Sequence, residues 1–156
     1  MKISRSLLAL SFALTLACDA VGGGPTGTLV VVAHGGVEAR EGIPASRTQD
    51  GYEIRYSHVV LELEDLRLET RDGDSALIEV SPVVVELVPA PSEAFRLEGV
   101  PAQRWDAVRF SSRPVPEGAR IADGVDATIA ERMRSEGWSL YIEGTLVGRT
   151  PPDGDP

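Results

Sequence analysis

Short runs of β-branched and apolar residues, separated by turns that contain glycine, proline or aspartate, recur along most of this chain. Residues 28–33 and 83–88 are nearly continuous apolar runs, which is typical of strands covered on both faces. Residues 66–70 and 76–80 flank an Asp-Gly turn, which predicts a hairpin. About seven or eight short strands of this kind predict an all-β domain. Its expected architecture is an antiparallel β-sandwich of the Greek-key type, immunoglobulin- or prealbumin-like, with one short helix before the last strand.

The segment 52–68 changes the phase of its apolar positions twice. Even-numbered positions are apolar within 52–56, odd-numbered positions within 59–63, and even-numbered positions again within 66–68. Because side chains of a strand alternate strictly between two faces, each slip predicts a bulge or a bend. The first is expected at residues 57–58, as when a strand passes from one sheet to another.

The expected helix follows a loop over residues 113–126 that contains two prolines and two glycines. Thr128 and Glu131 have capping-box spacing, and Gly137 is placed to end the helix. Another long loop, with room for one short turn of helix, is expected over residues 37–51.

The last expected strand covers residues 138–146. Its alternation places Trp138, Leu140 and Ile142 on one face, which we expect to lie in the core, and Tyr141 on the other. An exposed aromatic ring can stack on a sugar, so Tyr141 is the candidate ligand-binding residue, for a glycan.

The N-terminus carries a pattern of export. Lys2 and Arg5 precede an uncharged apolar run at 7–17, which is too short for a membrane span and suits a secretory signal. Cys18, the only cysteine, follows directly. This junction resembles a bacterial lipoprotein signal, in which the cysteine is lipidated with diacylglycerol and an N-acyl chain such as palmitate. An ordinary cleaved signal that happens to contain a cysteine is the alternative.

These features predict the organisation of the chain. Residues 1–17 are the expected signal peptide, and 18–27 a glycine-rich flexible tether that begins at the lipidated Cys18. The β-sandwich domain is expected over 28–147, followed by a disordered tail at 148–156. Two or more acyl chains would anchor the protein stably in the cell envelope, in the inner or the outer membrane.

Charge excludes one class of partner. The whole chain carries 15 basic and 24 acidic residues, for a net charge of −9. Without residues 1–17, thirteen arginines remain against the same 24 acids, and the only lysine, Lys2, is gone. Nucleic-acid binding requires a basic stripe, and these arginines are scattered among carboxylates, so we expect no nucleic-acid partner.

The candidate metal ligands are few. His34 follows a strand and His58 lies at the phase slip, which suits polar residues at a strand end and a bulge better than a copper or zinc site with three or more ligands. Asp72 and Asp74 have a spacing compatible with calcium, but Asp-Gly-Asp is more often only a hairpin turn. These four residues are therefore weak metal candidates.

Catalytic signatures are missing from the sequence. It contains no nucleophile elbow, zinc-protease, phosphate-loop or dinucleotide-binding motif. Pairs of carboxylates cannot be assigned a role, because 24 acids make coincidental pairs inevitable. We therefore expect no enzyme activity, no catalytic residue and no cofactor.

Several segments together resemble a group of uncharacterised lipoproteins of environmental, myxobacterium-like bacteria. The similar stretches are a Gly-Ile-Pro segment at 42–44, Asp-Gly-Tyr at 50–52, the strand at 59–68, Gly-Val-Pro-Ala at 99–102 and Leu-Tyr-Ile-Glu-Gly-Thr at 140–145. They are structural turns and strands, so the resemblance implies a fold and an envelope location but no reaction.

The chain departs from that group after its last similar strand. Members of the group continue with a further aromatic-rich strand, whereas here a tail rich in proline, aspartate and glycine follows Gly148. Either this chain is a shortened member of the group, or the last strand is missing, which would leave an exposed sheet edge that is prone to association.

The expected function is that of a lipid-anchored cell-envelope β-sandwich with a non-catalytic binding or structural role. Its partners are the membrane, through Cys18, and a protein or glycan that the sequence does not identify. The alternative from another class is a periplasmic protein that binds copper or calcium, through His34 and His58 with carboxylates.

Overall fold

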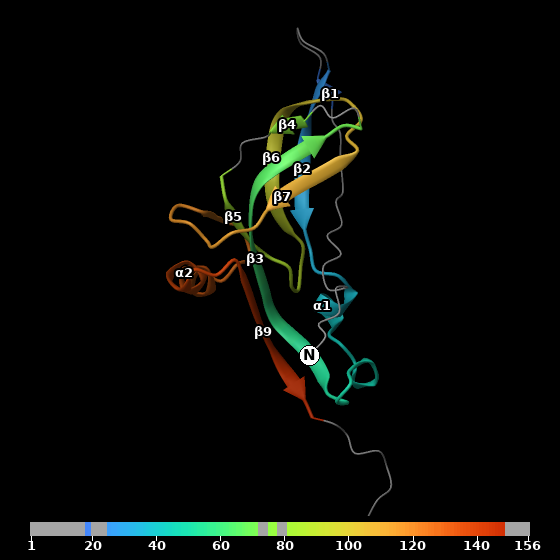
Figure 1. Ribbon diagram of the computed structural model, residues 1–156, viewed down its shortest axis with the longest axis vertical. Helices are drawn as coiled ribbons and strands as arrows, with labels where there is room; N and C mark the ends of the chain where they lie inside the picture. Colours follow the sequence, from blue (N-terminus) through green and yellow to red (C-terminus); the bar gives the residue numbers. More distant parts are fainter. Residues whose placement is uncertain (1–17, 20–24, 72–74, 78–80, 149–156) are drawn as a thin grey trace, which may run out of the picture.

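A computed structural model describes residues 18–19, 25–71, 75–77 and 81–148 (Figure 1). It is mostly β, with far more of the described residues in strands than in helices. The strands are β1 (Cys18–Asp19), β2 (Thr26–Ala33), β3 (Glu53–Glu69), β4 (Ser75–Leu77), β5 (Val83–Glu86), β6 (Ser92–Pro101), β7 (Ala107–Ser111), β8 (Arg120–Ile121) and β9 (Leu140–Val147). The helices are α1 (Val37–Glu41), the 3-10 turn η1 (Ala45–Arg47) and α2 (Ala127–Glu136). The prediction of a mostly β chain with a short helix before the last strand is confirmed.

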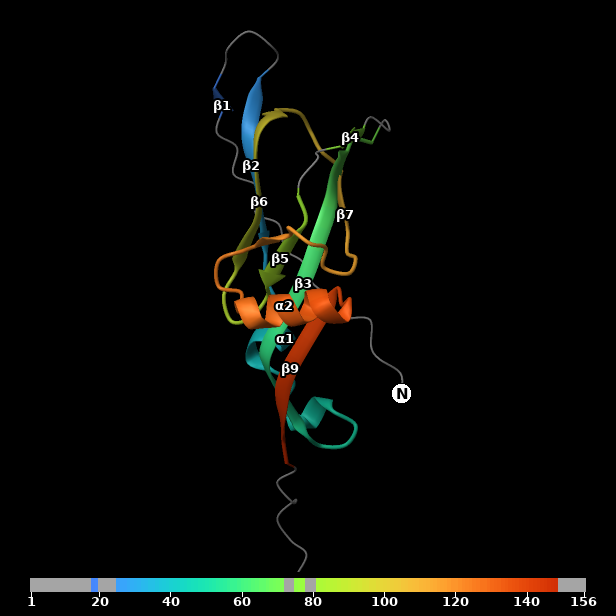
Figure 2. The same cartoon turned by 90° about the vertical axis from the view of Figure 1, so that its left-hand side faces the viewer.

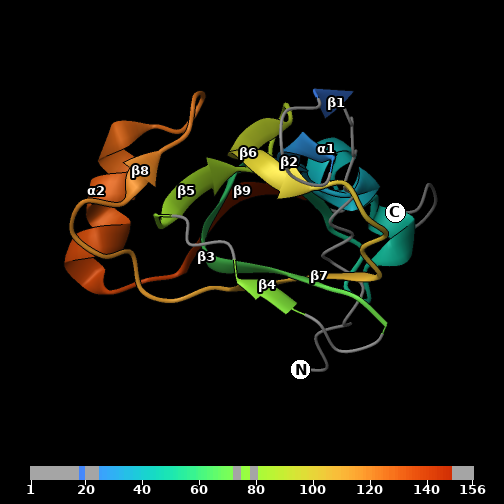
Figure 3. The same cartoon turned by 90° about the horizontal axis from the view of Figure 1, so that it is seen from above.

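The strands form two sheets. The smaller has the order β1-β2-β6, and the larger the order β4-β3-β5-β8, with β7 and β9 also paired to β3. All pairs are antiparallel except the short β5–β8 pair, which is parallel and departs from the expected all-antiparallel arrangement. Seen from above, β2 and β6 lie opposite β3, β4 and β7 (Figure 3).

Strand β3 organises the larger sheet, and its 17 residues cover the segment in which both slips were predicted. Its first half pairs with β9 and β5, and its second half with β7 and β4. Both predicted slips are confirmed. The β9 register shifts between Tyr56 and His58, and the β7 register shifts between Glu64 and Arg67. Asp65, inside the second shift, has a φ of 54°, and this slip marks the exchange of partner strands.

The buried apolar residues form two clusters. The larger lies between the two sheets and includes Leu29, Leu63, Val85 and Phe95. The smaller lies between the other face of the larger sheet and the segment that ends in α2, and it includes Met133, which is fully buried. In Figure 2, α2 crosses in front of β3 and β9. The larger sheet is therefore covered on both faces near α2.

Helix α2 begins one residue earlier than its expected cap. Asp126 is the N-cap, and its carboxylate accepts a hydrogen bond from the Thr128 N–H at 2.7 Å, so the predicted capping role of Thr128 is wrong. Asp126 takes this position because its short side chain reaches the amide two residues ahead. Gly137 ends the helix as predicted, with a left-handed φ of 68°.

Strand β9 differs most from its prediction. Leu140 and Ile142, expected in the core, are 41% and 54% exposed. Trp138 and Tyr141 instead pack partly buried against the smaller cluster. The reason is position: β9 lies beside β3 below the end of β2, where the smaller sheet no longer covers it (Figure 1).

The remaining differences concern where strands begin and how they are covered. Strand β2 begins at Thr26, and Cys18 and Asp19 pair with Gly27 and Thr26, within the stretch expected as a tether. Burial alternates along β2, so it is not covered on both faces, whereas β5 is. The hairpin of β3 and β4 is present, although residues 72–74 and 78–80 lie outside the described residues.

Candidate functional site

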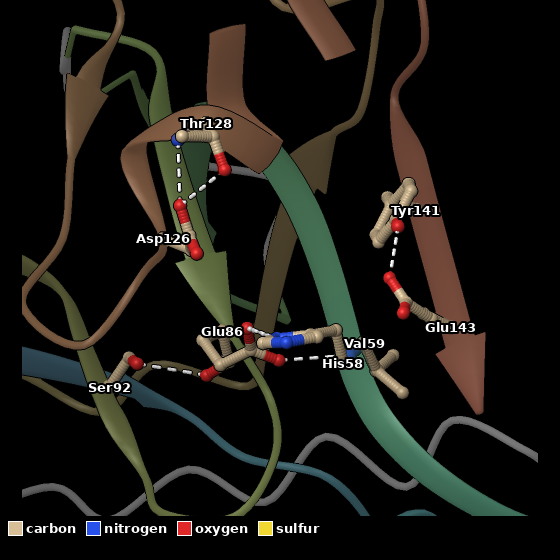
Figure 4. Close-up of polar contacts among 8 residues, drawn as sticks. All are labelled: His58, Val59, Glu86, Ser92, Asp126, Thr128, Tyr141 and Glu143. Carbon is tan, nitrogen blue, oxygen red and sulfur yellow. Dashed lines mark hydrogen bonds and ion pairs between the residues drawn. The ribbon is translucent and has the colours of Figure 1, made fainter. Parts of the chain in front are cut away.

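The bulge at Ser57 and His58 determines to which face of the larger sheet the neighbouring side chains of β3 point. Tyr56 and Val59 both face the core between the sheets, because the extra residue returns the strand to the same face. His58 consequently points to the opposite face, the one on which α2 lies (Figure 4).

His58 is held by a buried carboxylate. Its Nδ1 lies 3.2 Å from Oε2 of Glu86, and Oε1 of Glu86 accepts a hydrogen bond from the Val59 N–H at 2.8 Å. Glu86 is only 4% exposed, whereas the His58 side chain is 35% exposed. The carboxylate therefore satisfies a backbone donor at the bulge and fixes one ring nitrogen of an accessible histidine.

A serine lies nearby but does not extend this pair into a proton relay. The Ser92 hydroxyl donates to the backbone carbonyl of Glu86 at 2.8 Å (Figure 4). Nucleophilic catalysis would require the hydroxyl to face the imidazole. The arrangement of Ser92, Glu86 and His58 orients a histidine and gives no activated nucleophile.

Tyr141 lies on the same face of the sheet, on β9. Its hydroxyl donates to Glu143, and this hydrogen bond raises the pKa of Tyr141 (Figure 4). Its ring stacks on Trp138 with centroids 6.2 Å apart, and the Arg132 guanidinium lies over both rings at 5.9 and 5.3 Å. The Tyr141 ring, which we predicted to bind a glycan, is thus in contact with other side chains of the protein. Its role in ligand binding stays a prediction.

Glu62 is the second buried carboxylate of this face. It is completely buried, and its Oε2 accepts a hydrogen bond from the Arg113 N–H at 2.6 Å, while its Oε1 has no partner. Burial raises its pKa to about 7, the Arg113 N–H opposes that rise, and the neighbouring Glu64 adds to it. The Glu62 carboxyl therefore stays protonated to a higher pH than an exposed glutamate does.

The opposite face holds a small apolar cavity. Its volume is about 70 Å³, and its lining comes from the segment that follows β2, from α1, from β3 and β9 and from Leu87: His34, Gly35, Gly36, Ala39, Tyr56, Val59, Leu87, Leu140 and Ile142. Gly35 allows this close packing. Its N–H donates to the Leu87 carbonyl at 2.8 Å, and a Cβ at Gly35 would lie 2.7 Å from that oxygen.

The structure does not bring the predicted metal ligands together. His34 lines the cavity, with its Nδ1 3.0 Å from the Gly35 carbonyl oxygen, whereas His58 lies on the other face of the sheet. Asp72 and Asp74 lie outside the described residues. In the part of the chain that the structure describes, no three histidine, cysteine or acidic residues are grouped to hold a metal ion.

Sequence reasoning missed the two buried glutamates. In Leu61-Glu62-Leu63 the alternation predicts a solvated Glu62, and Glu86 interrupts an otherwise apolar strand. The available signal was the apolar side of α2, Ile129 and Met133, which had to pack against some face of the sheet.

Comparisons with protein-family models, with curated proteins and with solved structures found no match to this chain. Among the described helices, none has the length and apolar character to cross a membrane.

Proposed function

We propose that this protein is an exported, lipid-anchored β-sandwich of the cell envelope, with a non-catalytic role in binding a partner protein. The sandwich belongs, in this proposal, to the Greek-key class with immunoglobulin- or prealbumin-like topology. Its support is the apolar cluster that residues of both sheets build together.

The observation that carries the proposal is the separation of Cys18 from the apolar cavity. Cys18 pairs with Gly27 at the start of β2, and His34, which lines the cavity, follows the end of β2. Eight strand residues span about 25 Å. Figure 1 places β1 at one end of the long axis and β9 towards the other. A lipid on Cys18 would therefore leave the cavity at the end of β2 that is farther from the membrane.

The size of the cavity favours a protein partner. Pockets for small ligands usually hold roughly 300 to 1,000 Å³, whereas this cavity holds about 70 Å³. That volume suits one apolar side chain. The exposed Leu140 and Ile142 at its rim provide further apolar contact.

The anchor is tested by intact-mass analysis and membrane fractionation of the wild type and of Cys18→Ser. We expect a lipidated mass in the membrane fraction for the wild type, and its loss in Cys18→Ser. Ser11→Ala is the matched control, because it changes the apolar run and keeps Cys18. A wild-type product that is cleaved and soluble would overturn the proposal and favour a freely diffusing protein.

A further inference from the structure

We propose that β9 pairs with β9 of a second copy of this chain, antiparallel and centred on Gly144. The inference goes beyond the proposed function, because it concerns the edge of the sheet and needs neither the lipid nor the cavity. It is carried by three observations on β9: an open edge, an exposed apolar face and a sequence that complements itself.

The first observation is that β9 has one open edge. Within the described residues its only strand partner is β3, along register positions from Leu140 to Val147. Figures 1 and 2 show β9 at the margin of the molecule, running beyond α2. An unpaired edge offers a row of backbone donors and acceptors to another strand.

The second observation is that nothing in β9 protects this edge. Natural edge strands usually carry lysines, prolines or several charges. In β9 the only charged side chain is Glu143. Its apolar side chains are exposed instead: Leu146 by 66%, Ile142 by 54%, Leu140 by 41% and Val147 by 37%.

The third observation is the self-complementarity of the strand. When two antiparallel copies are centred on Gly144, Ile142 lies opposite Leu146 of the second copy, and Tyr141 lies opposite Val147. Glu143 then lies opposite Thr145 of the second copy, so no two carboxylates meet.

Other registers are poorer. Centring the pair on Glu143 places the two Glu143 carboxylates opposite each other, which is unfavourable. Centring it on Thr145 places Leu146 opposite Gly144 and Glu143 opposite Val147, so the apolar pairs are lost. The register centred on Gly144 is therefore the most favourable of the three. It gives a two-fold symmetric dimer in which one sheet continues through both copies.

Disulfide trapping tests the register. In the full chain with Cys18→Ser, the double variant Glu143→Cys and Thr145→Cys places position 143 of one copy opposite position 145 of the other in the Gly144 register. The matched controls are the single variants Glu143→Cys and Thr145→Cys, each of which brings two cysteines opposite each other only if the pair is centred on its own residue. We expect a covalent dimer on oxidation of the double variant and a monomer for each single variant. A single variant that cross-links as well as the double variant, or no dimer in the double variant, would overturn the register.

Sedimentation velocity tests the dimer without introduced cysteines. We expect the Cys18→Ser chain to dimerise reversibly, and Leu146→Lys in that background to weaken dimerisation by at least about tenfold. Phe110→Lys is the control, because Phe110 is also exposed, by 37%, but lies on β7. A monomeric Cys18→Ser chain, or equal weakening by both variants, would overturn the proposal. Leu146 does not line the cavity, so this outcome is separable from the proposed function.

Discussion

Glu62 and Glu86 are both buried on the α2 side of the sheet, but their hydrogen bonds differ. Glu86 uses both carboxylate oxygens, one for His58 and one for the Val59 N–H. Glu62 uses only one oxygen, for the Arg113 N–H. A buried oxygen without a partner is costly when it is charged. The two residues should therefore respond differently to pH and to substitution.

Glu62 should make the protein less stable as the pH rises. Its carboxyl ionises near 4.5 in the unfolded chain and at about 7 in the folded state. Between these values the folded state holds a proton that the unfolded state has lost, so the free energy of unfolding falls by about 3 kcal/mol as pH increases, and stays level above that window. Glu64, Asp65 and Arg113 are the charged groups around it.

Urea denaturation at about pH 5 and pH 8 checks this prediction. Glu62→Gln should flatten the difference between the two conditions, because the amide does not titrate. The exposed Glu117→Gln should keep the wild-type difference. A wild type with no loss of stability over this window would contradict the raised pKa.

Substitutions of Glu86 and His58 should show how much each of the two hydrogen bonds of Glu86 contributes to the free energy of unfolding. Glu86→Ala leaves the Val59 N–H, at a buried bulge, without its acceptor, so we expect a loss of about 2 to 3 kcal/mol in the free energy of unfolding. Glu86→Gln retains an acceptor oxygen and should cost less. His58→Ala, on a partly exposed side chain, should cost least. Equal losses in chemical denaturation would show that the backbone bond is not the main contribution.

At the scale of elements, the pairing of β9 with β3 depends on Gly144. A Cβ at this position would lie 2.4 Å from the Arg55 carbonyl oxygen, beside the bulge of β3. Gly144→Ala should therefore force the two strands apart and lower the free energy of unfolding by about 1 to 3 kcal/mol. Gly148→Ala, where a Cβ would meet open space, is the matched control. Thermal denaturation should show this difference in stability, and an equal loss of stability in both variants would contradict the role of Gly144.

The elements also show which features were predictable from sequence. The two slips in β3 were readable because strand alternation is a local property of consecutive residues. The exposure of Leu140 and Ile142 was not, because it depends on where another sheet ends. The burial of Glu62 likewise depends on α2 and on the segment around Arg113, both distant in sequence.

The pair of His58 and Glu86 was likewise predictable from the sequence only in part. The sequence placed His58 at a bulge, yet its partner Glu86 lies 28 residues away. Pairing of β3 with β5 brings them together, since Val60 lies opposite Glu86. No local pattern specifies which face of a sheet a later helix will cover.

At the scale of the whole molecule, the proposed anchor predicts an upright orientation. Gln103 lies near the Cys18 end, since its neighbour Ala102 donates to the Pro25 carbonyl at 2.7 Å, and Val37 lies beyond the other end of β2. A dye on Gln103→Cys should be quenched by a lipid-borne acceptor more than a dye on Val37→Cys. Lipidation of Cys18 would leave each introduced cysteine as the only free thiol.

The quenching should be measured in the Leu146→Lys background, because we expect this variant to be monomeric. Equal quenching at the two sites would mean that a single copy lies flat on the bilayer. Stronger quenching at Val37 would mean that the cavity end faces the lipid, contrary to the proposed function.

The position of β1 at the end opposite β9 has a consequence for a pair of anchored copies. The two-fold axis of the proposed dimer turns one copy end over end relative to the other, so the two Cys18 residues would stand at opposite poles. One bilayer could hold both lipids only if the pair lay along its surface. Two facing bilayers could each take one lipid, and the pair would then act as a strut whose length sets the gap between them.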